Sequence, residues 1–123
     1  MTTLARHVAA LDLLRGRPFR DGGHHLAELA PADPSEEQAE AERTALGGLL
    51  TGRWGPPQHL GLGSIPLRAA RGEHIPRPWD LLGDAVPDIE LWRAEGRWIA
   101  LGVVRTAQDE HRILVCVTTV DPP

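Results

Sequence analysis

Three runs of strand-forming residues fill the C-terminal third of the chain, residues 88–120, and two short polar turns separate them. The first turn, residues 94–96, reads Ala-Glu-Gly and fits a three-residue hairpin loop in which the glycine is left-handed. Residues 108–110 form the second turn. Strands joined by such short turns pair with their neighbours, so the pattern predicts an antiparallel three-stranded meander.

The middle run of the meander is apolar at both of its alternating sets of positions. Alternate side chains of a strand point to opposite faces of a sheet, and a strand that is apolar on both faces is covered on both. We expect helices on one face, and a third helix with long loops, or alternatively another protein chain, on the other. Trp92 and Trp98 flank the first turn and are expected near each other on one face. The two apolar sets are Trp98, Ala100 and Val104, and Ile99, Leu101 and Val103.

Helical periodicity precedes the meander. Apolar residues from Leu4 to Leu14 recur at spacings of three and four, which predicts a helix over residues 3–15. Ser35 and Gln38 form a capping box, which predicts a second helix from residue 36 to about residue 50. A short third helix is expected over residues 78–83, because its proline suits the first helical position. The residues that the second helix is expected to bury are Ala41, Ala45, Leu46, Leu49 and Leu50.

The remaining segments contain many glycine and proline residues. Residues 17–34 are predicted to form a long loop with one helical turn at residues 24–29, and residues 65–76 to form a second loop. Residues 58–62 are expected to form a short edge strand. The chain is therefore predicted to be one α+β domain over residues 1–123, with two N-terminal helices, a short third helix and an antiparallel sheet of three to four strands that ends in the meander.

The charge balance narrows the expected partners. The chain of 123 residues is 41% hydrophobic and 24% charged, which is typical of a folded domain, and its net charge is −4. This charge disfavours nucleic acid, because phosphate binding needs a basic surface, and it favours a basic protein partner. All 13 basic residues are arginine, and lysine, asparagine and tyrosine are absent. This bias indicates a GC-rich genome, such as that of an actinobacterium, and lessens the value of arginine as a sign of phosphate recognition.

Cysteine content and hydropathy indicate in which cellular compartment the protein is expected. Cys116 is the only cysteine, so no internal disulfide is possible, and its place within an apolar strand is typical of a buried thiol. The N-terminal segment lacks the uninterrupted apolar core of a signal peptide, and no window is long and apolar enough for a membrane span. We therefore expect a cytoplasmic protein with no membrane partner.

No metal or cofactor site is predicted. A helical zinc site places two histidines three or four residues apart, and none of the six histidines has that spacing. His24 and His25 adjoin Asp21 and Glu28, which could supply further ligands, but adjacent residues of a glycine-rich segment are more typical of a solvated loop.

One short motif allows an enzymatic alternative. Arg71, Glu73 and His74 stand together in the second predicted loop. Histidine as the base and arginine as the group that stabilises a phosphorane would suit a small metal-independent ribonuclease. The acidic net charge opposes this alternative.

Acidic residues and tryptophans provide the candidate surface for a partner. Carboxylates surround the third predicted helix and the first meander strand, and others start the second helix. They would form one acidic patch if these elements share a side of the molecule. Tryptophan is enriched at interface hot spots, so two tryptophans join this set. The predicted partner-binding residues are Glu36, Glu37, Glu40, Trp79, Asp80, Asp84, Asp88, Glu90 and Trp92.

The order of elements from Ser35 to Val120 is leading helices, a tryptophan-containing turn and an antiparallel meander, in a small acidic chain. This layout resembles small uncharacterised actinobacterial α+β proteins and, more loosely, the immunity proteins of bacterial toxin systems. The resemblance implies a non-enzymatic inhibitor that masks a basic protein partner, and it assigns no functional residue. The alternatives are the ribonuclease and a homodimeric regulatory or structural module joined through the sheet.

Overall fold

An antiparallel sheet of five strands in the order β1-β5-β4-β3-β2 organises the fold. The computed structural model describes residues 2–19 and 23–123. The strands are β1 (His24–Leu29), β2 (Gln58–Gly61), β3 (Asp88–Ala94), β4 (Arg97–Arg105) and β5 (His111–Thr118). The helices are α1 (Thr3–Gly16), α2 (Glu36–Trp54), α3 (Ser64–Ala70) and α4 (Trp79–Ala85). The fold is thus α+β as predicted, but the described residues hold one more helix and at least one more strand than expected.

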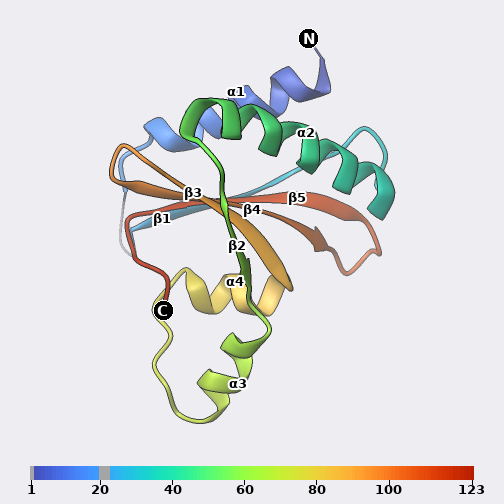
Figure 1. The fold of residues 1–123 in the computed structure, drawn as a ribbon. Helices are drawn as coiled ribbons and strands as arrows, with labels where there is room; N and C mark the ends of the chain where they lie inside the picture. Colours follow the sequence, from blue (N-terminus) through green and yellow to red (C-terminus); the bar gives the residue numbers. More distant parts are fainter. Residues whose placement is uncertain (1, 20–22) are drawn as a thin grey trace.

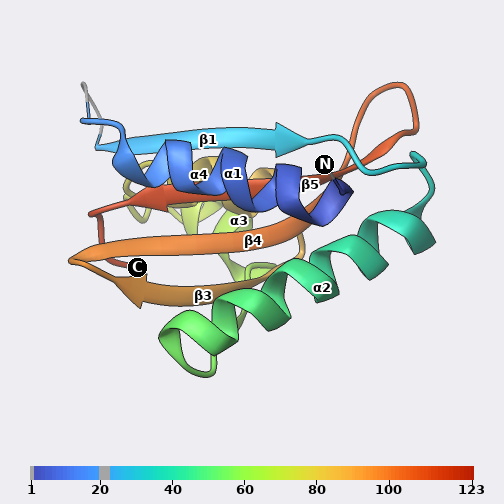
Figure 2. The same ribbon diagram turned by 90° about the horizontal axis from the view of Figure 1, so that it is seen from above.

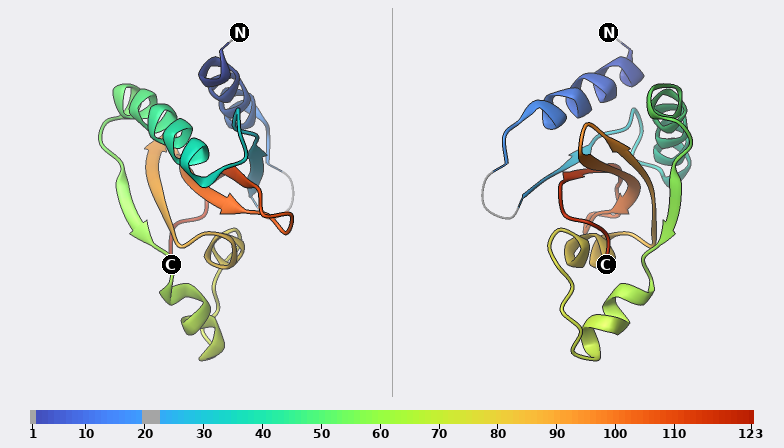
Figure 3. Two further views of the ribbon diagram at one scale, coloured as in Figure 1. Left: turned by 90° about the vertical axis from the view of Figure 1, so that its right-hand side faces the viewer. Right: turned by 60° about the vertical axis from the view of Figure 1, so that its left-hand side comes forward.

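Helices lie on both sides of the sheet. Figure 1 shows α1 and α2 on one face and α3 and α4 on the other, and the two views of Figure 3 show the same layers. Seen from above, α1 runs near β1 and β5, whereas α2 crosses the β3 side of the sheet (Figure 2). None of the helices in the described parts of the chain is long and apolar enough to cross a bilayer.

The predicted meander is confirmed, but its first turn differs. Glu95 and Gly96 have φ values of 54° and 76°, and Ala94 pairs with Arg97, so the turn has two residues rather than three. Two positive φ values are typical of a type I′ turn, whose twist matches that of the flanking strands.

The shorter turn also moves the tryptophans apart. A three-residue loop would have placed Trp92 opposite Trp98, whereas Trp92 pairs with Ile99 and Trp98 with Arg93. A shift of one residue turns a side chain to the other face of the sheet. The two tryptophans therefore lie on opposite faces, and the prediction that they are neighbours is wrong.

The long loop predicted for residues 17–34 is interrupted by β1, which pairs antiparallel with β5 from His24 opposite Thr118 to Leu29 opposite Ile113. The expected helical turn at these residues is therefore wrong. The segment has no β-branched residue, so its extended conformation comes from pairing with β5 rather than from its own propensity. The second predicted loop is likewise partly helical, because α3 begins at Ser64 and holds Pro66 in its first turn, where proline is tolerated.

Helix α2 is longer than predicted and turned about its axis. It continues to Trp54 and ends at Gly55, whose φ of 85° suits glycine. Its buried residues are Ala39, Leu46, Gly47 and Leu50, whereas the predicted Ala41, Ala45 and Leu49 are exposed. The inward face includes the half-buried side chains of Glu42 and Arg43. Glu42 bonds to His7 on α1, and Arg43, which periodicity assigns to solvent, forms an ion pair with Glu90 on β3.

Each face of the sheet has its own core. Leu46, Trp92 and Ile99 belong to the cluster under α1 and α2, while Trp79, Leu91 and Ala100 belong to the cluster under α3 and α4. The prediction that the middle strand is covered on both faces is therefore confirmed, and the chain provides this cover itself. Among the described residues, neither face of the sheet is uncovered, so a homodimer could not form through a sheet face. The homodimeric alternative would have to use the edges of the sheet.

Candidate functional site

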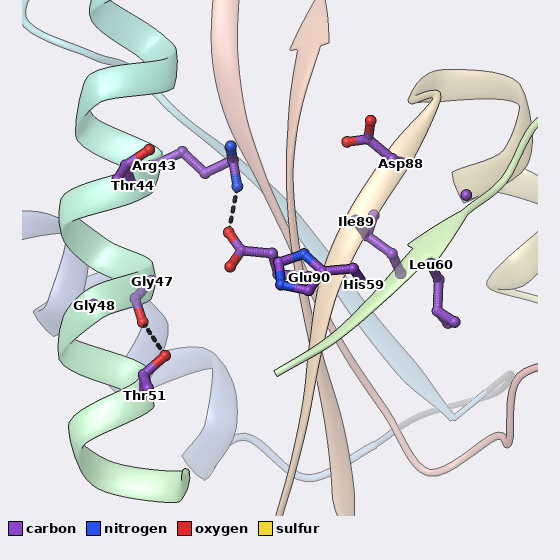
Figure 4. Close-up of a pocket in the computed structure, with 11 residues that line it drawn as sticks. Arg43, Thr44, Gly47, Gly48, Thr51, His59, Leu60, Asp88, Ile89 and Glu90 are labelled. Carbon is purple, nitrogen blue, oxygen red and sulfur yellow. Dashed lines mark hydrogen bonds and ion pairs between the residues drawn. The ribbon is translucent and has the colours of Figure 1, made fainter. Parts of the chain in front are cut away.

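A solvent-open groove of about 560 Å³ lies between α2 and the end strand β2 (Figure 4). Residues 43–51 in the middle of α2 form one wall, and β2 with the start of β3 forms the other. Its lining residues are Arg43, Thr44, Gly47, Gly48, Thr51, His59, Leu60, Gly61, Asp88, Ile89 and Glu90. Six of these eleven residues have polar or charged side chains, and the other five are glycine, leucine or isoleucine.

The strand register explains why polar groups collect here. His59 pairs with Glu90, and Gly61 pairs with Asp88. Directly opposed residues of an antiparallel pair point to the same face of the sheet. Trp92, two residues after Glu90 on β3, points to this face as well, and it packs in the core under α2. The rows of residues on β2 and β3 that face α2 thus read His-Gly and Asp-Glu, and they meet the helix wall across the groove.

A glycine in α2 lets the sheet and the helix approach each other. A Cβ atom at Gly47 would lie 3.3 Å from Oε1 of Glu90 and 3.6 Å from the Trp92 ring. Gly47 is buried, and its carbonyl accepts a hydrogen bond of 2.8 Å from the Thr51 hydroxyl. A helix interior normally disfavours glycine. Its presence here is explained by the Glu90 carboxylate, which lies against the helix at this turn.

One guanidinium group joins two carboxylates at the upper end of the groove. Arg43 donates through Nη2 and Nε to Oε2 of Glu40, at 2.7 and 3.0 Å, and through Nη1 to Oε1 of Glu90 (Figure 4). The side chains of Arg43 and Glu90 are only 22% and 17% exposed. Because ion pairs are stronger when partly shielded from water, this pair fixes the position of the Glu90 carboxylate.

The groove carries excess negative charge. Asp88 is exposed, and its carboxylate has no hydrogen-bond or ion-pair partner among the described residues. Arg43 contributes one positive charge, against one negative charge each from Glu40, Glu90 and Asp88, which leaves two uncompensated negative charges. His59 is exposed on the opposite wall. The site can therefore accept a cationic group, and Asp88 is the carboxylate open to it.

The two tryptophans predicted to bind a partner are core residues. Trp79 is 0% exposed and donates through Nε1 to the Val120 carbonyl at 3.0 Å. Trp92 is 2% exposed and donates through Nε1 to the Gly55 carbonyl at 3.1 Å. Each indole nitrogen is satisfied inside the protein, so the prediction that these rings form a surface hot spot is wrong.

The predicted acidic patch is divided between the two faces. Helix α2 carries Glu36, Glu37 and Glu40 on one face of the sheet, and α4 carries Asp80 and Asp84 on the other (Figure 1). The expectation that they share one side is therefore wrong, because α4 packs under the sheet. Of the predicted residues, the groove brings together Asp88 and Glu90, with Glu40 at its rim through Arg43.

The predicted ribonuclease residues do not form a joint site. Glu73 accepts two hydrogen bonds from Arg68, at 2.6 and 2.8 Å, and these bonds hold the pKa of Glu73 below its ordinary value. Arg71 and His74 are exposed, and neither contacts that carboxylate. Arg71, Glu73 and His74 do not line the groove.

The other candidate groups for catalysis or metal binding are also weak. In the described ranges, no three histidine, cysteine or acidic side chains gather in a way that could hold a metal ion, and Asp21 lies outside those ranges. Burial raises the pKa of the Cys116 thiol to about 12, so the nucleophilic thiolate is scarcely populated at neutral pH.

Apart from Asp88 and Glu90, the lining residues were not predicted, and the polar ones among them are Arg43, Thr44, Thr51 and His59. Periodicity placed Arg43 in solvent, and an isolated histidine beside two prolines carries no motif. The available signal was Gly47 inside a helical pattern together with Gly61 inside a strand, because glycine at such positions often has a packing or functional reason.

No protein-family model, curated protein or solved structure matches the chain.

Proposed function

We propose that the chain is a non-enzymatic protein-binding module that recognises a basic surface of its partner through the groove between α2 and β2. The observation that carries this proposal is the Asp88 carboxylate, which is exposed and has no partner within the described residues of an already acidic groove. An immunity or antitoxin-like inhibitor, which masks a basic protein, is one form of this function.

The groove favours a cation for two physical reasons. Glu90 is held by Arg43, so its carboxylate does not have to reorganise when a cationic side chain enters. The Glu90 carboxylate beside Asp88 is also only 17% exposed, so water screens its charge less than it screens a carboxylate on an open surface. Complementary charge further raises the rate of encounter with a basic partner.

The test is affinity purification from the native host with three tagged versions of the chain: wild type, Asp88→Arg and Glu37→Arg. Both variants change the net charge by the same amount, and both sites are exposed. We expect the wild type and Glu37→Arg to retain a stoichiometric basic protein and Asp88→Arg to lose it. Binding should then be reproduced with the two purified proteins and should weaken as salt is raised.

Two results would contradict the proposal. One is the absence of any stoichiometric partner of the wild type. The other is a partner that Asp88→Arg retains, or that Glu37→Arg also loses, because either result would place recognition outside the groove. Thermal unfolding of both variants must match the wild type for the comparison to hold.

A further inference from the structure

Strand β2 ends the sheet, and its outer edge faces away from β3. Figure 1 looks onto this edge, with β2 crossing in front of the other strands and the α1–α2 layer and the α3–α4 layer on either side. The groove lies on the α2 side of the same strand. An extended chain that paired with β2 would therefore place every second side chain in the groove.

The hydrogen bonding of β2 shows which backbone groups are available. The Leu62 amide donates to the Pro87 carbonyl at 2.8 Å, one step beyond the pair of Gly61 and Asp88. Hydrogen-bonded and non-hydrogen-bonded pairs alternate along an antiparallel ladder. Leu60 is therefore bonded to β3, while the N–H and C=O groups of His59 and Gly61 point to the outer edge, where both residues are exposed.

Side-chain geometry adds selectivity to this edge. A ligand residue opposite His59 or Gly61 directs its side chain toward α2, as those two residues do. Gly61 has no side chain, and a Cβ atom there would meet nothing within 4 Å. A long cationic side chain opposite Gly61 can thus pass over this glycine to Asp88 on the next strand, about 10 Å away at two strand spacings.

Building on the proposed function, we propose that the partner contributes an extended segment that adds to β2 as a sixth strand, with arginine or lysine at alternate positions directed at Asp88 and Glu90. Main-chain bonds to His59 and Gly61 supply affinity, and the acidic groove supplies selectivity, as in other cases of strand addition. Pro56 and Pro57 precede β2 and cannot donate to an added strand, so the segment is short.

The experiment starts from a display library of random nine-residue peptides selected on the whole chain. We expect the enriched peptides to carry arginine or lysine at every second position. One such peptide is synthesised with capped ends, and amide hydrogen exchange of the protein is measured by NMR with and without it. The His59 and Gly61 amides should slow about tenfold or more at saturation, whereas the Leu60 amide, already bonded to β3, should not change.

The other free edge of the sheet provides an internal control. In β1, the Thr119 amide donates to the Gly23 carbonyl, so by the same alternation Leu26 and Glu28 direct their backbone groups outward. Their amide exchange should stay unchanged if the peptide selects β2. Protection at these positions instead of at His59 and Gly61 would overturn the proposal.

Two substitutions at one position separate main-chain bonding from other effects. Gly61→Pro removes the outward N–H without breaking a bond to β3, whereas Gly61→Ala keeps that N–H and has room for its methyl group. We expect Gly61→Pro to weaken peptide binding at least about tenfold more than Gly61→Ala does, because Gly61→Ala keeps the main-chain bond and only narrows the path of the cationic side chain.

The outcomes distinguish this inference from the function on which it rests. Strand addition is overturned if Gly61→Pro binds like Gly61→Ala, or if selected peptides lack the alternation. The groove as a binding site still stands in that case, provided that Asp88→Arg abolishes binding of the native partner. If Asp88→Arg also has no effect, both proposals fail. Slowed exchange at His59 and Gly61 together with loss of binding in Gly61→Pro supports both.

Discussion

The carboxylate of Glu42 connects three segments of the chain, and we expect its removal to be among the more costly single changes on α2. Oε1 lies 2.7 Å from Nε2 of His7 on α1. Oε2 accepts the Ala32 amide at 2.8 Å and the Gln38 side-chain amide at 2.7 Å. Since a carboxylate only accepts, Nε2 of His7 must carry the proton.

The cost of Glu42→Ala follows from what water can replace. Ala32 is exposed and Gln38 half-buried, so water can take over their bonds at a cost of about 0.5 kcal/mol each. His7 is only 4% exposed, and a buried donor left without an acceptor costs about 1–3 kcal/mol. With the lost burial of the Cγ methylene, the free energy of unfolding should fall by about 3 kcal/mol.

The effect should depend on pH in a defined direction. Burial alone would raise the pKa of Glu42, but the hydrogen bonds from Gln38, Ala32 and His7 outweigh it, and the pKa lies below the ordinary value of 4.5. A carboxyl group whose pKa is lower in the folded state stabilises the fold above its unfolded pKa, and this contribution is lost as pH falls through the folded pKa. The difference between the wild type and Glu42→Ala should therefore be largest near neutral pH and shrink below about pH 4.5.

The assay is urea unfolding of the wild type, Glu42→Ala and Glu37→Ala, followed by tryptophan fluorescence at about pH 7 and about pH 3. Glu37 is exposed on the same helix, so its substitution should cost less than about 0.5 kcal/mol. A loss below about 1 kcal/mol for Glu42→Ala at neutral pH, or a loss equally large in acid, would refute the role assigned to this carboxylate.

Two further predictions concern the core. A Cβ atom at Gly83 would lie 2.6 Å from Cγ2 of Ile65, so Gly83→Ala should destabilise the protein by about 1–2 kcal/mol. A Cβ atom at Gly48 would meet nothing within 4 Å, so Gly48→Ala should stabilise the protein by about 0.5–1 kcal/mol. Thermal unfolding of both variants checks this. A change of stability in the same direction in both variants would contradict it. Cys116 should react with a thiol-specific disulfide reagent only under unfolding conditions, because burial raises its pKa to about 12; rapid labelling of the folded protein would disagree.

The meander could be predicted because its signals are local. Alternating apolar residues define each strand, and β4 is apolar on both faces, which predicts that both of its faces are buried. The register of the first hairpin could not be predicted in this way. A turn of two or of three residues decides whether Trp92 pairs with Trp98, and the sequence Ala-Glu-Gly fits both lengths. Local chemistry thus specified the elements but not their exact pairing.

Strand β1 and the buried face of α2 could not be predicted because each depends on a distant partner. Residues 24–29 are extended because they pair with the outer edge of β5, which follows about 80 residues later in the chain. Helix α2 turns Glu42 and Arg43 inward because His7 and Glu90 are there to bind them. Periodicity counts charged residues as outward and misses such pairs.

The candidate site follows the same logic. The acidic net charge directed the search to carboxylates as partner-binding groups, but it distributed that role over every carboxylate near a turn. Only the fold separates Asp80 and Asp84, under the sheet, from Asp88 and Glu90, beside α2. It also pairs Glu90 with Arg43, which leaves Asp88 as the groove carboxylate without a partner among the described residues. Under the proposed function, recognition depends on charges that the chain leaves uncompensated, and the one in the groove lies beside the free edge of β2.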